Sequence, residues 1–282
     1  MASEMSQRDH GRRSTFSIVT VVFNDLPGLK ATRESIGAQS FSDFEWVVID
    51  GASTDGTAEY LAELERNRDA GGLSGSRLRT LSEPDRGIYH AMNKGLALCA
   101  GEYVSFMNAG DTFAGPTVLE ELARLAGAGE YDFLYGDALE HDGASPLLKR
   151  ARNIDAIRYS MFTHHQAMLY RRQFVAEHGI RFDERMRVGG DYAFTAEVYV
   201  KGCRALRVSF PICVFERGGA SHRLEAIGRR EVLQVQRKIL GLGPVRLLVN
   251  GIGFRLSSFF RANFRAAYDA LRFRRRHGDP SR

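Results

Sequence analysis

The first third of the chain alternates short apolar runs with segments of helical spacing, and this pattern constrains the fold more than any other feature. The apolar runs are rich in β-branched and aromatic residues, which favours strands, and apolar residues at helical intervals follow each run. The expected strands are 16–23, 44–50, 77–82 and 102–107, and the expected helices are 29–38, 57–68 and 87–100. Strands that alternate with helices usually pair in parallel, so we expect an α/β fold with a mainly parallel sheet and helices on both faces.

The rest of the chain is less regular. Its apolar runs predict strands at 132–137 and 163–170 and helices near 174–178 and over 191–202. A proline divides the next apolar stretch, and we expect two paired strands, 205–208 and 212–216, around Pro211.

Polar residues follow the ends of four successive apolar strands. They are Asn24, Asp50, Asp85 and Asp111. Ligands of parallel α/β sheets bind beyond the carboxyl ends of the strands, so we expect these four side chains to converge on one edge. Acidic residues repel phosphates unless a divalent cation bridges them. A pyrophosphate ligand at this edge would therefore require Mg²⁺ or Mn²⁺, both of which prefer oxygen ligands.

Several common catalytic motifs are absent from the sequence. No G-x-G-x-x-G follows the first strand, which disfavours a dinucleotide-dependent oxidoreductase, and no P-loop, H-E-x-x-H or G-x-S-x-G occurs. Four other runs resemble those of family 2 glycosyltransferases, over roughly Thr15 to Ser221. They are FEWVVIDGASTDGT (44–57), SEPDRGIYHAMNKGLALCAGEYVSFMNAGD (82–111), HHQAMLYRR (164–172) and GGDYAF (189–194).

The resemblance implies the GT-A fold, a Rossmann-like and mainly parallel sheet, and a reaction that inverts the anomeric centre. The most similar subgroup builds bacterial exopolysaccharide and O-antigen units on a lipid carrier. Seven positions match those that bind the nucleotide sugar in the family: Thr20, Val21, Asn24, Asp50, Asp85, Asn93 and Asn108. For Asp50, the family role is binding of the donor base, and the alternative is a turn or helix cap.

One aspartate matches the metal ligand of the family. The segment Asn108-Ala109-Gly110-Asp111 occupies the place of the D-x-D motif, and only Asp111 is left of its aspartates. The resemblance makes Asp111 the ligand of Mg²⁺ or Mn²⁺, and the alternative is a turn residue. Magnesium keeps waters and uses few protein carboxylates, so one Asp together with donor phosphates suffices.

A second aspartate, Asp191, matches the general base that removes the proton of the acceptor hydroxyl. The alternative is an N-cap of the helix that follows. The pair His165-Gln166 matches the acceptor side of the family site, although a lone His is usually structural. Gly218-Gly219 and Ser221-His222 resemble the loop that closes over the diphosphate.

The charge of the chain is unevenly distributed. From residue 217 onward there are 15 Lys and Arg against 4 Asp and Glu, a net +11, so the first 216 residues carry −6 of the total +5. Over 252–276, an apolar arc lies opposite a basic arc on a helical wheel. The apolar arc contains Ile252, Leu256, Phe259, Phe260, Phe264, Ala267 and Leu271, and the basic arc contains Arg255, Arg261, Arg265, Arg272 and Arg276. A basic amphipathic helix is typical of a membrane interface. The alternative is a helix packed on the catalytic domain, and no motif accompanies the charge to indicate nucleic acid.

These observations predict three regions: a disordered segment 1–14, a GT-A domain 15–222 and a basic amphipathic helical extension 223–282. We expect transfer of a sugar from a nucleotide-diphosphate donor, a UDP-sugar, to a hydroxyl of a lipid-linked saccharide. No signal peptide or membrane span is visible, and the three cysteines are widely spaced, so we expect a cytoplasmic protein on the inner face of the membrane. The alternatives are transfer to polyprenyl phosphate or a soluble saccharide, and a non-catalytic module that binds nucleotide sugars.

Overall fold

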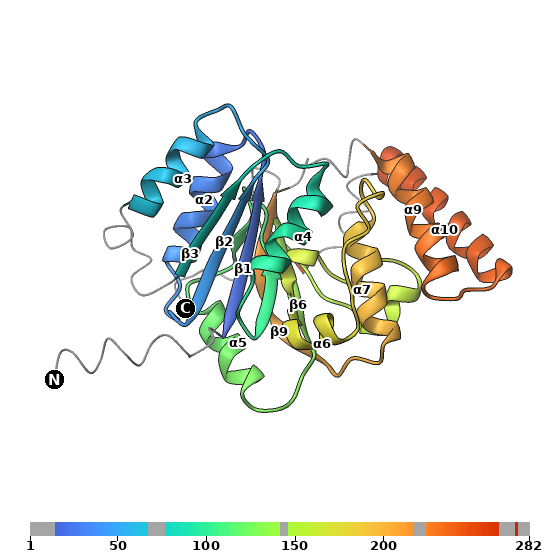
Figure 1. Ribbon diagram of the computed structural model, residues 1–282. Coiled ribbons are helices and arrows are strands. Elements are labelled where there is room, and N and C mark those ends of the chain that lie inside the picture. The colour runs from blue at the N-terminus through green and yellow to red at the C-terminus, as the bar shows by residue number, and fades with distance from the viewer. Residues whose placement is uncertain (1–14, 67–76, 142–145, 217–223, 265–273, 276–282) are drawn as a thin grey trace.

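A ten-stranded mixed sheet runs through the molecule, with helices on both faces (Figure 1). The computed structural model describes residues 15–66, 77–141, 146–216, 224–264 and 274–275. The strand order is β10-β7-β6-β8-β4-β1-β2-β3; off this path, β9 pairs with β6 and β5 pairs with β9. The segment 1–14, expected to be disordered, lies outside the described residues, as does the glycine loop at 217–223.

The first half of the chain forms the parallel part of the sheet, as the sequence predicts. The strands β3, β2, β1 and β4 pair in parallel in that order. Their bounds, with the helices between them, are β1 (Phe16–Val22), α2 (Leu26–Gly37), β2 (Phe44–Asp50), α3 (Thr57–Arg66), β3 (Arg77–Ser82), α4 (Ile88–Leu98) and β4 (Tyr103–Phe106). Alternate residues of a strand face opposite sides of a sheet. Val19 and Val21 of β1 lie in one core cluster, while Ile18 and Val22 lie in the other, so helices cover both faces.

The second half adds mostly antiparallel strands. Its elements are β5 (Thr112–Phe113), α5 (Val118–Ala126), β6 (Phe133–His141), β7 (Leu147–Lys149), η1 (Ile154–Arg158), η2 (His165–Ala167), β8 (Met168–Arg171), α6 (Arg172–Glu177), α7 (Gly190–Val200) and β9 (Ala205–Glu216). Antiparallel ladders join β4 to β8, β8 to β6, β6 to β7 and β5 to β9. The parallel arrangement therefore extends beyond β1–β4 only where β6 pairs with β9.

Two sequence predictions in this half are wrong in detail. The expected strand over 163–170 begins only at Met168, because His165–Ala167 form a 3₁₀ turn. The two expected strands around Pro211 are one strand, β9, which pairs in parallel with β6 rather than with itself. Pro211 lies opposite Asp137 at an irregularity of this ladder. A proline has no N–H to donate, so it is tolerated at such a break in the pairing.

The C-terminal region contains two helices instead of the single helix expected over 252–276. They are α9 (Glu225–Lys238) and α10 (Pro244–Asn263). Pro244 stands in the first turn of α10, where its missing N–H costs no hydrogen bond. The helix ends at Asn263, and Arg274–Arg275 form β10, which pairs with β7. Ala267 and Leu271 of the predicted apolar arc lie outside the described residues.

Helix α9 belongs to the core of the molecule. Val235, Leu240 and Leu242 are buried in the same cluster as the side chains of α7. Gln236 donates to the Tyr159 carbonyl at 2.9 Å, and Asn250 of α10 donates to the Arg158 carbonyl at 3.0 Å. The boundary after residue 222 stays a prediction of the sequence, and α9 packs in the same core cluster as α7.

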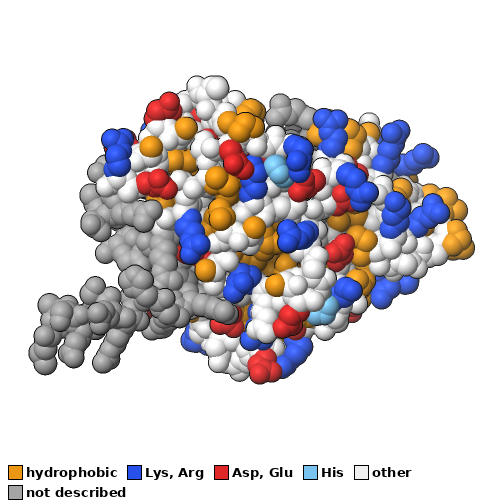
Figure 2. All heavy atoms as spheres, viewed as in Figure 1, with side chains coloured by type: hydrophobic (Ala, Val, Ile, Leu, Met, Phe, Trp, Pro, Cys, Tyr) orange, Lys and Arg blue, Asp and Glu red, His pale blue; other side chains and the backbone are white. Residues whose placement is uncertain are grey.

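The outer face of α10 is exposed. Its large apolar side chains are at least half exposed: Val245, Leu248, Val249, Ile252, Leu256, Phe259, Phe260 and, at the C-cap, Phe264. The described members of the predicted apolar arc therefore face solvent. Figure 2 shows hydrophobic and basic side chains together over α10, at the right edge of the molecule. Within the described part of the chain, no helix has both the length and the apolar character of a membrane span.

Candidate functional site

The loops that follow β1 and β2 are joined by hydrogen bonds at the carboxyl edge of the sheet. Asn24 has a positive φ of 51°, a conformation that Asn tolerates better than most residues. Its backbone N–H donates to Ser53 Oγ at 2.7 Å, and its side-chain oxygen accepts from the Thr54 N–H at 2.8 Å. The exposed Asn24 thus shapes this edge, and its predicted contact with the donor remains a prediction.

Asp50, which ends β2, and Asp85, which follows β3, have different surroundings. Asp50 is fully buried and accepts hydrogen bonds from the backbone and hydroxyl of Ser53 and from Ser82 Oγ, the last at 2.6 Å. Asp85 instead lies over Gly51: a Cβ at Gly51 would come within 2.6 Å of its carboxylate. Asp85 is partly exposed and accepts from the Gly87 N–H at 2.8 Å. Of the two, Asp85 is the carboxylate that faces the open edge.

Three other predicted nucleotide contacts have structural partners. Thr20 is fully buried, and its hydroxyl accepts from the Trp46 indole at 2.9 Å. Val21 is nearly buried, and its carbonyl accepts from the backbone of Ala109. The amide group of Asn93 donates to the Phe182 carbonyl and accepts from the Phe182 N–H, both at 3.0 Å.

The 3₁₀ turn η2 brings the predicted metal ligand and the predicted base to one place. Gln166 Nε2 donates to Asp111 Oδ2 at 2.6 Å. On the adjacent residue, His165 Nε2 lies 3.3 Å from Asn108 Nδ2, and His165 Nδ1 lies 3.5 Å from Asp191 Oδ2. Three segments far apart in the sequence, namely the loop after β4, η2 and the first turn of α7, therefore meet at these five side chains.

Asp191 is not the N-cap of α7, which was the alternative considered from the sequence, and its role as base remains a prediction. The N-cap of α7 is Gly189, and the Asp191 carboxylate accepts from the Tyr192 N–H at 2.8 Å. Its side chain is 23% exposed. Burial first, and then the negative charge of Asp191, hold the pKa of the neighbouring Tyr89 hydroxyl well above its usual range. Tyr89 therefore stays neutral.

The residues around Asp111 fit a cation that is shared with a ligand. Asp111 is 6% exposed, and two amide oxygens beside it, Asn108 Oδ1 and Gln166 Oε1, are buried without a hydrogen-bond partner. Carboxylate and amide oxygens suit Mg²⁺ and Mn²⁺. Among the described residues, no group of three or more His, Cys, Asp or Glu is placed to hold an ion. Such a site requires further oxygen ligands from outside the protein. His222, in the loop expected to close over the diphosphate, lies outside the described residues.

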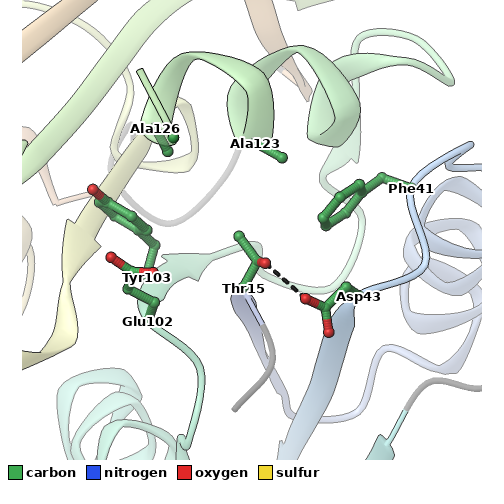
Figure 3. Close-up of a pocket in the computed structure, with 8 residues that line it drawn as sticks. Thr15, Phe41, Asp43, Glu102, Tyr103, Ala123 and Ala126 are labelled. Carbon is green, nitrogen blue, oxygen red and sulfur yellow. Dashed lines mark hydrogen bonds between the residues drawn. The ribbon is translucent and has the colours of Figure 1, made fainter. Parts of the chain in front are cut away.

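A cavity of about 310 Å³ lies at the opposite end of the sheet (Figure 3). It is lined by Thr15, Asp43 and Glu102, which precede β1, β2 and β4, together with Phe41, Tyr103 and residues of α5. Thr15 Oγ1 donates to Asp43 Oδ2 at 2.8 Å. None of the predicted site residues lines this cavity, so it is separate from the carboxyl edge.

Comparison with known proteins decides the family. The model of "Glycosyl transferase family 2" matches residues 17–187, which is more than half of the chain. The chain belongs to glycosyltransferase family 2. An uncharacterized glycosyltransferase of Mycobacterium tuberculosis is 30% identical to the enzyme over 220 residues, 74% of this chain and 78% of the relative. The amylovoran biosynthesis glycosyltransferase AmsB of Erwinia amylovora is 26% identical over 229 residues, 76% and 74% of the two chains.

Solved structures show that the glycosyltransferase has the GT-A fold. TarS residues 1–349 of S. aureus, in complex with UDP-GlcNAc, superposes with a TM-score of 0.64 and 19% identity, covering 88% of this chain and 74% of that fragment. The mannosyltransferase PcManGT of Pyrobaculum calidifontis, in complex with GDP-Man and Mn²⁺, gives a TM-score of 0.63 at 18% identity, covering 93% and 79%. The expected enzyme class and fold are thereby confirmed, as is a relation to enzymes of polysaccharide biosynthesis.

Proposed function

We propose that the enzyme transfers a sugar, with inversion, from a UDP-sugar to a hydroxyl of a lipid-linked saccharide. The observation that carries the proposal is the meeting at η2 of Asp111, through Gln166, with Asp191, through His165. In this proposal, Gln166 contacts the residue that serves the donor diphosphate, Asp111, and the adjacent His165 contacts the base for the acceptor, Asp191. Asp85, facing the open edge beyond β2, is the carboxylate best placed to contact the nucleoside.

The chemistry requires one base and no covalent intermediate. The acceptor oxygen attacks C1 of the sugar as the bond from C1 to the diphosphate breaks, and Asp191 accepts the hydroxyl proton. Attack from the face opposite the leaving group inverts the anomeric centre. Asp111, with the amide oxygens of Asn108 and Gln166, would hold Mg²⁺ or Mn²⁺ at the diphosphate. Such a cation acts as a Lewis acid that neutralises charge on the leaving diphosphate.

The similar proteins support a nucleotide-sugar donor and a polysaccharide-related acceptor. TarS binds UDP-GlcNAc, PcManGT binds GDP-Man with Mn²⁺, and AmsB acts in amylovoran biosynthesis. Of uracil and guanine, the bases of these two donors, we propose uracil as the donor base of this enzyme.

We also propose that α10 binds an anionic membrane surface on the inner face of the cell membrane. The exposed apolar side chains of α10 recur every three or four residues, so they form one stripe along the helix. Arg246 and Arg255 on α10 are exposed, and so are Arg230, Arg237 and Lys238 on the neighbouring helix α9. An apolar stripe bordered by positive charge fits the headgroup region of anionic lipid. A lipid-linked acceptor would be reached from that position.

The test of the transferase assignment is release of nucleoside diphosphate from a panel of UDP- and GDP-sugars. We expect turnover of a UDP-sugar with Mn²⁺, and loss of turnover both in EDTA and in Asp111→Asn. Glu63→Gln, exposed on α3, serves as the control and should keep full activity. Donor binding without turnover of any donor would support the non-catalytic module, and full activity in EDTA would refute the metal-dependent site.

The membrane proposal is tested with vesicles of phosphatidylglycerol and phosphatidylcholine. Leu248→Asp and Phe259→Asp should each weaken co-sedimentation, because each places a charge in the apolar stripe. Val200→Asp is the control, since Val200 is an exposed apolar residue at the end of α7, outside the stripe of α10. Raising the salt concentration should weaken binding of the unmodified protein without abolishing it. If that protein stays in the supernatant at low salt, the membrane proposal is wrong.

A further inference from the structure

The segment that leads into Asp191 is held by a single carboxylate from the C-terminal helix α9. Glu231 Oε1 accepts from the Arg187 N–H at 2.8 Å, and Glu231 Oε2 accepts from the N–H groups of Val188 and Gly189 at 2.9 and 2.7 Å. Hydrogen bonds to an ionised carboxylate are stronger than those between neutral groups. Three consecutive backbone groups before the predicted base thus share one anchor, 42 to 44 residues away in sequence.

The same segment is clamped from the opposite side by α4. Tyr89 donates its hydroxyl proton to the Val188 carbonyl, and its ring lies against Gly190, so close that a Cβ there would come within 2.6 Å of the ring. A Cβ at Gly189 would come within 3.0 Å of the Glu231 side chain. Both glycines of Gly189-Gly190 therefore admit close approach, one to Glu231 and the other to Tyr89. The segment has little freedom to move without moving Asp191.

The position of Glu231 depends in turn on the packing of α9. Val235 of α9 is buried in the core, and Gln236 accepts from Asn250 of α10 at 3.1 Å while donating to the Tyr159 carbonyl. Arg229 donates to Ser258 of α10 at 3.0 Å. In Figure 1, α9 lies between α10 and α7. The C-terminal helices thus form part of the support of the site, in addition to carrying the exposed stripe.

We infer that Glu231 is a positioning residue for the catalytic base, an inference that rests on the proposed role of Asp191. Glu231 touches neither donor nor acceptor; it sets the place of the first turn of α7, and so the reach of the Asp191 carboxylate. Misplacement of a reacting group by about 1 Å can lower a rate by roughly 10²-fold. Loss of Glu231 should therefore lower kcat while leaving donor affinity unchanged.

The decisive experiment is a double-mutant cycle of Glu231→Gln with Asp191→Asn, measured as kcat for nucleoside diphosphate release and as donor Kd. Glutamine keeps the size of Glu231 but replaces one carboxylate oxygen with an NH₂ group. This group is a donor and cannot accept from the backbone N–H that faces it. Alone, Glu231→Gln should lower kcat about 10- to 100-fold. In the Asp191→Asn background it should change kcat less than about twofold, because the base it positions is already gone. Glu63→Gln, exposed on α3, is the matched control and should have no effect.

Hydrogen exchange supplies a readout that does not depend on turnover. In Glu231→Gln, the amides of 187–189 should exchange faster, while those of β1 and β2 stay protected. An equal fall in kcat in both backgrounds would mean general destabilisation and would overturn the inference, as would unchanged exchange at 187–189. If Asp191→Asn alone keeps full activity, the proposed base fails instead, and that result is distinct from a failure of the Glu231 contacts. Circular dichroism of each variant verifies folding at the assay temperature.

Discussion

Gly190→Ala is the substitution whose consequence is most directly set by the structure. The new Cβ would lie 2.6 to 2.7 Å from three atoms of the Tyr89 ring, whereas carbon atoms in contact are normally about 3.5–4.0 Å apart. The ring is held in place because it is 5% exposed, its hydroxyl bonds to Val188, and it stacks on Phe182 at 5.7 Å. The first turn of α7 must therefore move by about 1 Å, and Asp191 moves with it.

The expected cost follows from these contacts. Overpacking of a well-filled core costs about 1–3 kcal/mol, while alanine in a helix gains about 0.5–1 kcal/mol over glycine. The matched control is Gly251→Ala in α10, where a Cβ would meet no atom within 4 Å, so only the gain applies. We expect the two variants to differ by about 1–3 kcal/mol in the free energy of unfolding, measured by urea titration with circular dichroism. We also expect kcat of Gly190→Ala to fall by up to roughly 10²-fold. Equal stability of the two variants, with full activity, would refute this reading of the Tyr89 contact.

Three further predictions concern single residues of the site and its surroundings. Thr20→Val removes the acceptor of the buried Trp46 indole N–H and should lower the free energy of unfolding by about 1–3 kcal/mol in urea titration. Weaker donor binding at unchanged stability would instead indicate a nucleoside contact by the Thr20 side chain. Gln166→Leu removes the hydrogen bond to Asp111 and should raise the Mn²⁺ concentration for half-maximal activity about 10- to 100-fold, measured by metal titration; an unchanged requirement would show that Gln166 does not support the metal site. Burial first, and then the Lys149 charge, lower the pKa of His164 from 6.5 to about 4. Between these two pH values the unfolded chain binds more protons than the folded protein. The free energy of unfolding should therefore fall as the pH drops from about 6.5 to 4. His164→Gln should reduce this pH dependence of the free energy of unfolding, measured by urea titration at several pH values. The same pH dependence in both proteins would contradict its assignment to His164.

The parallel half of the sheet could be predicted because local and tertiary signals agree there. In β1 and β2, β-branched residues coincide with burial of both strand faces, and the following helices have regular apolar spacing. Pro211 misled the prediction because a proline normally ends a strand, whereas here it occupies an irregularity opposite Asp137. The start of α10 was missed, since the helix begins at Pro244 and its exposed apolar stripe begins at Val245, whereas the sequence indicated a helix only from residue 252.

The candidate site was predictable as a set of residues but not as a set of contacts. Asp111, His165 and Asp191 are recognisable from short motifs, and the structure brings them together through η2. The burial of Asp50 beneath Ser53 and Ser82 depends on strand register, which its own motif does not contain. Glu231 gave no signal at all, since its partners are backbone N–H groups more than 40 residues away. Contacts of this kind depend on the packing of α9 against α7.

The most direct test of the account is the rate of nucleoside diphosphate release by Asp191→Asn with saturating UDP-sugar and Mn²⁺. Asparagine keeps the size of Asp191 and its capacity to accept from the Tyr192 N–H, but it cannot take a proton. General-base catalysis contributes about 10²- to 10⁴-fold, so kcat should fall at least 10²-fold while donor Kd, measured by titration calorimetry, stays the same. A kcat within twofold of the unmodified enzyme would contradict the proposal that Asp191 is the catalytic base.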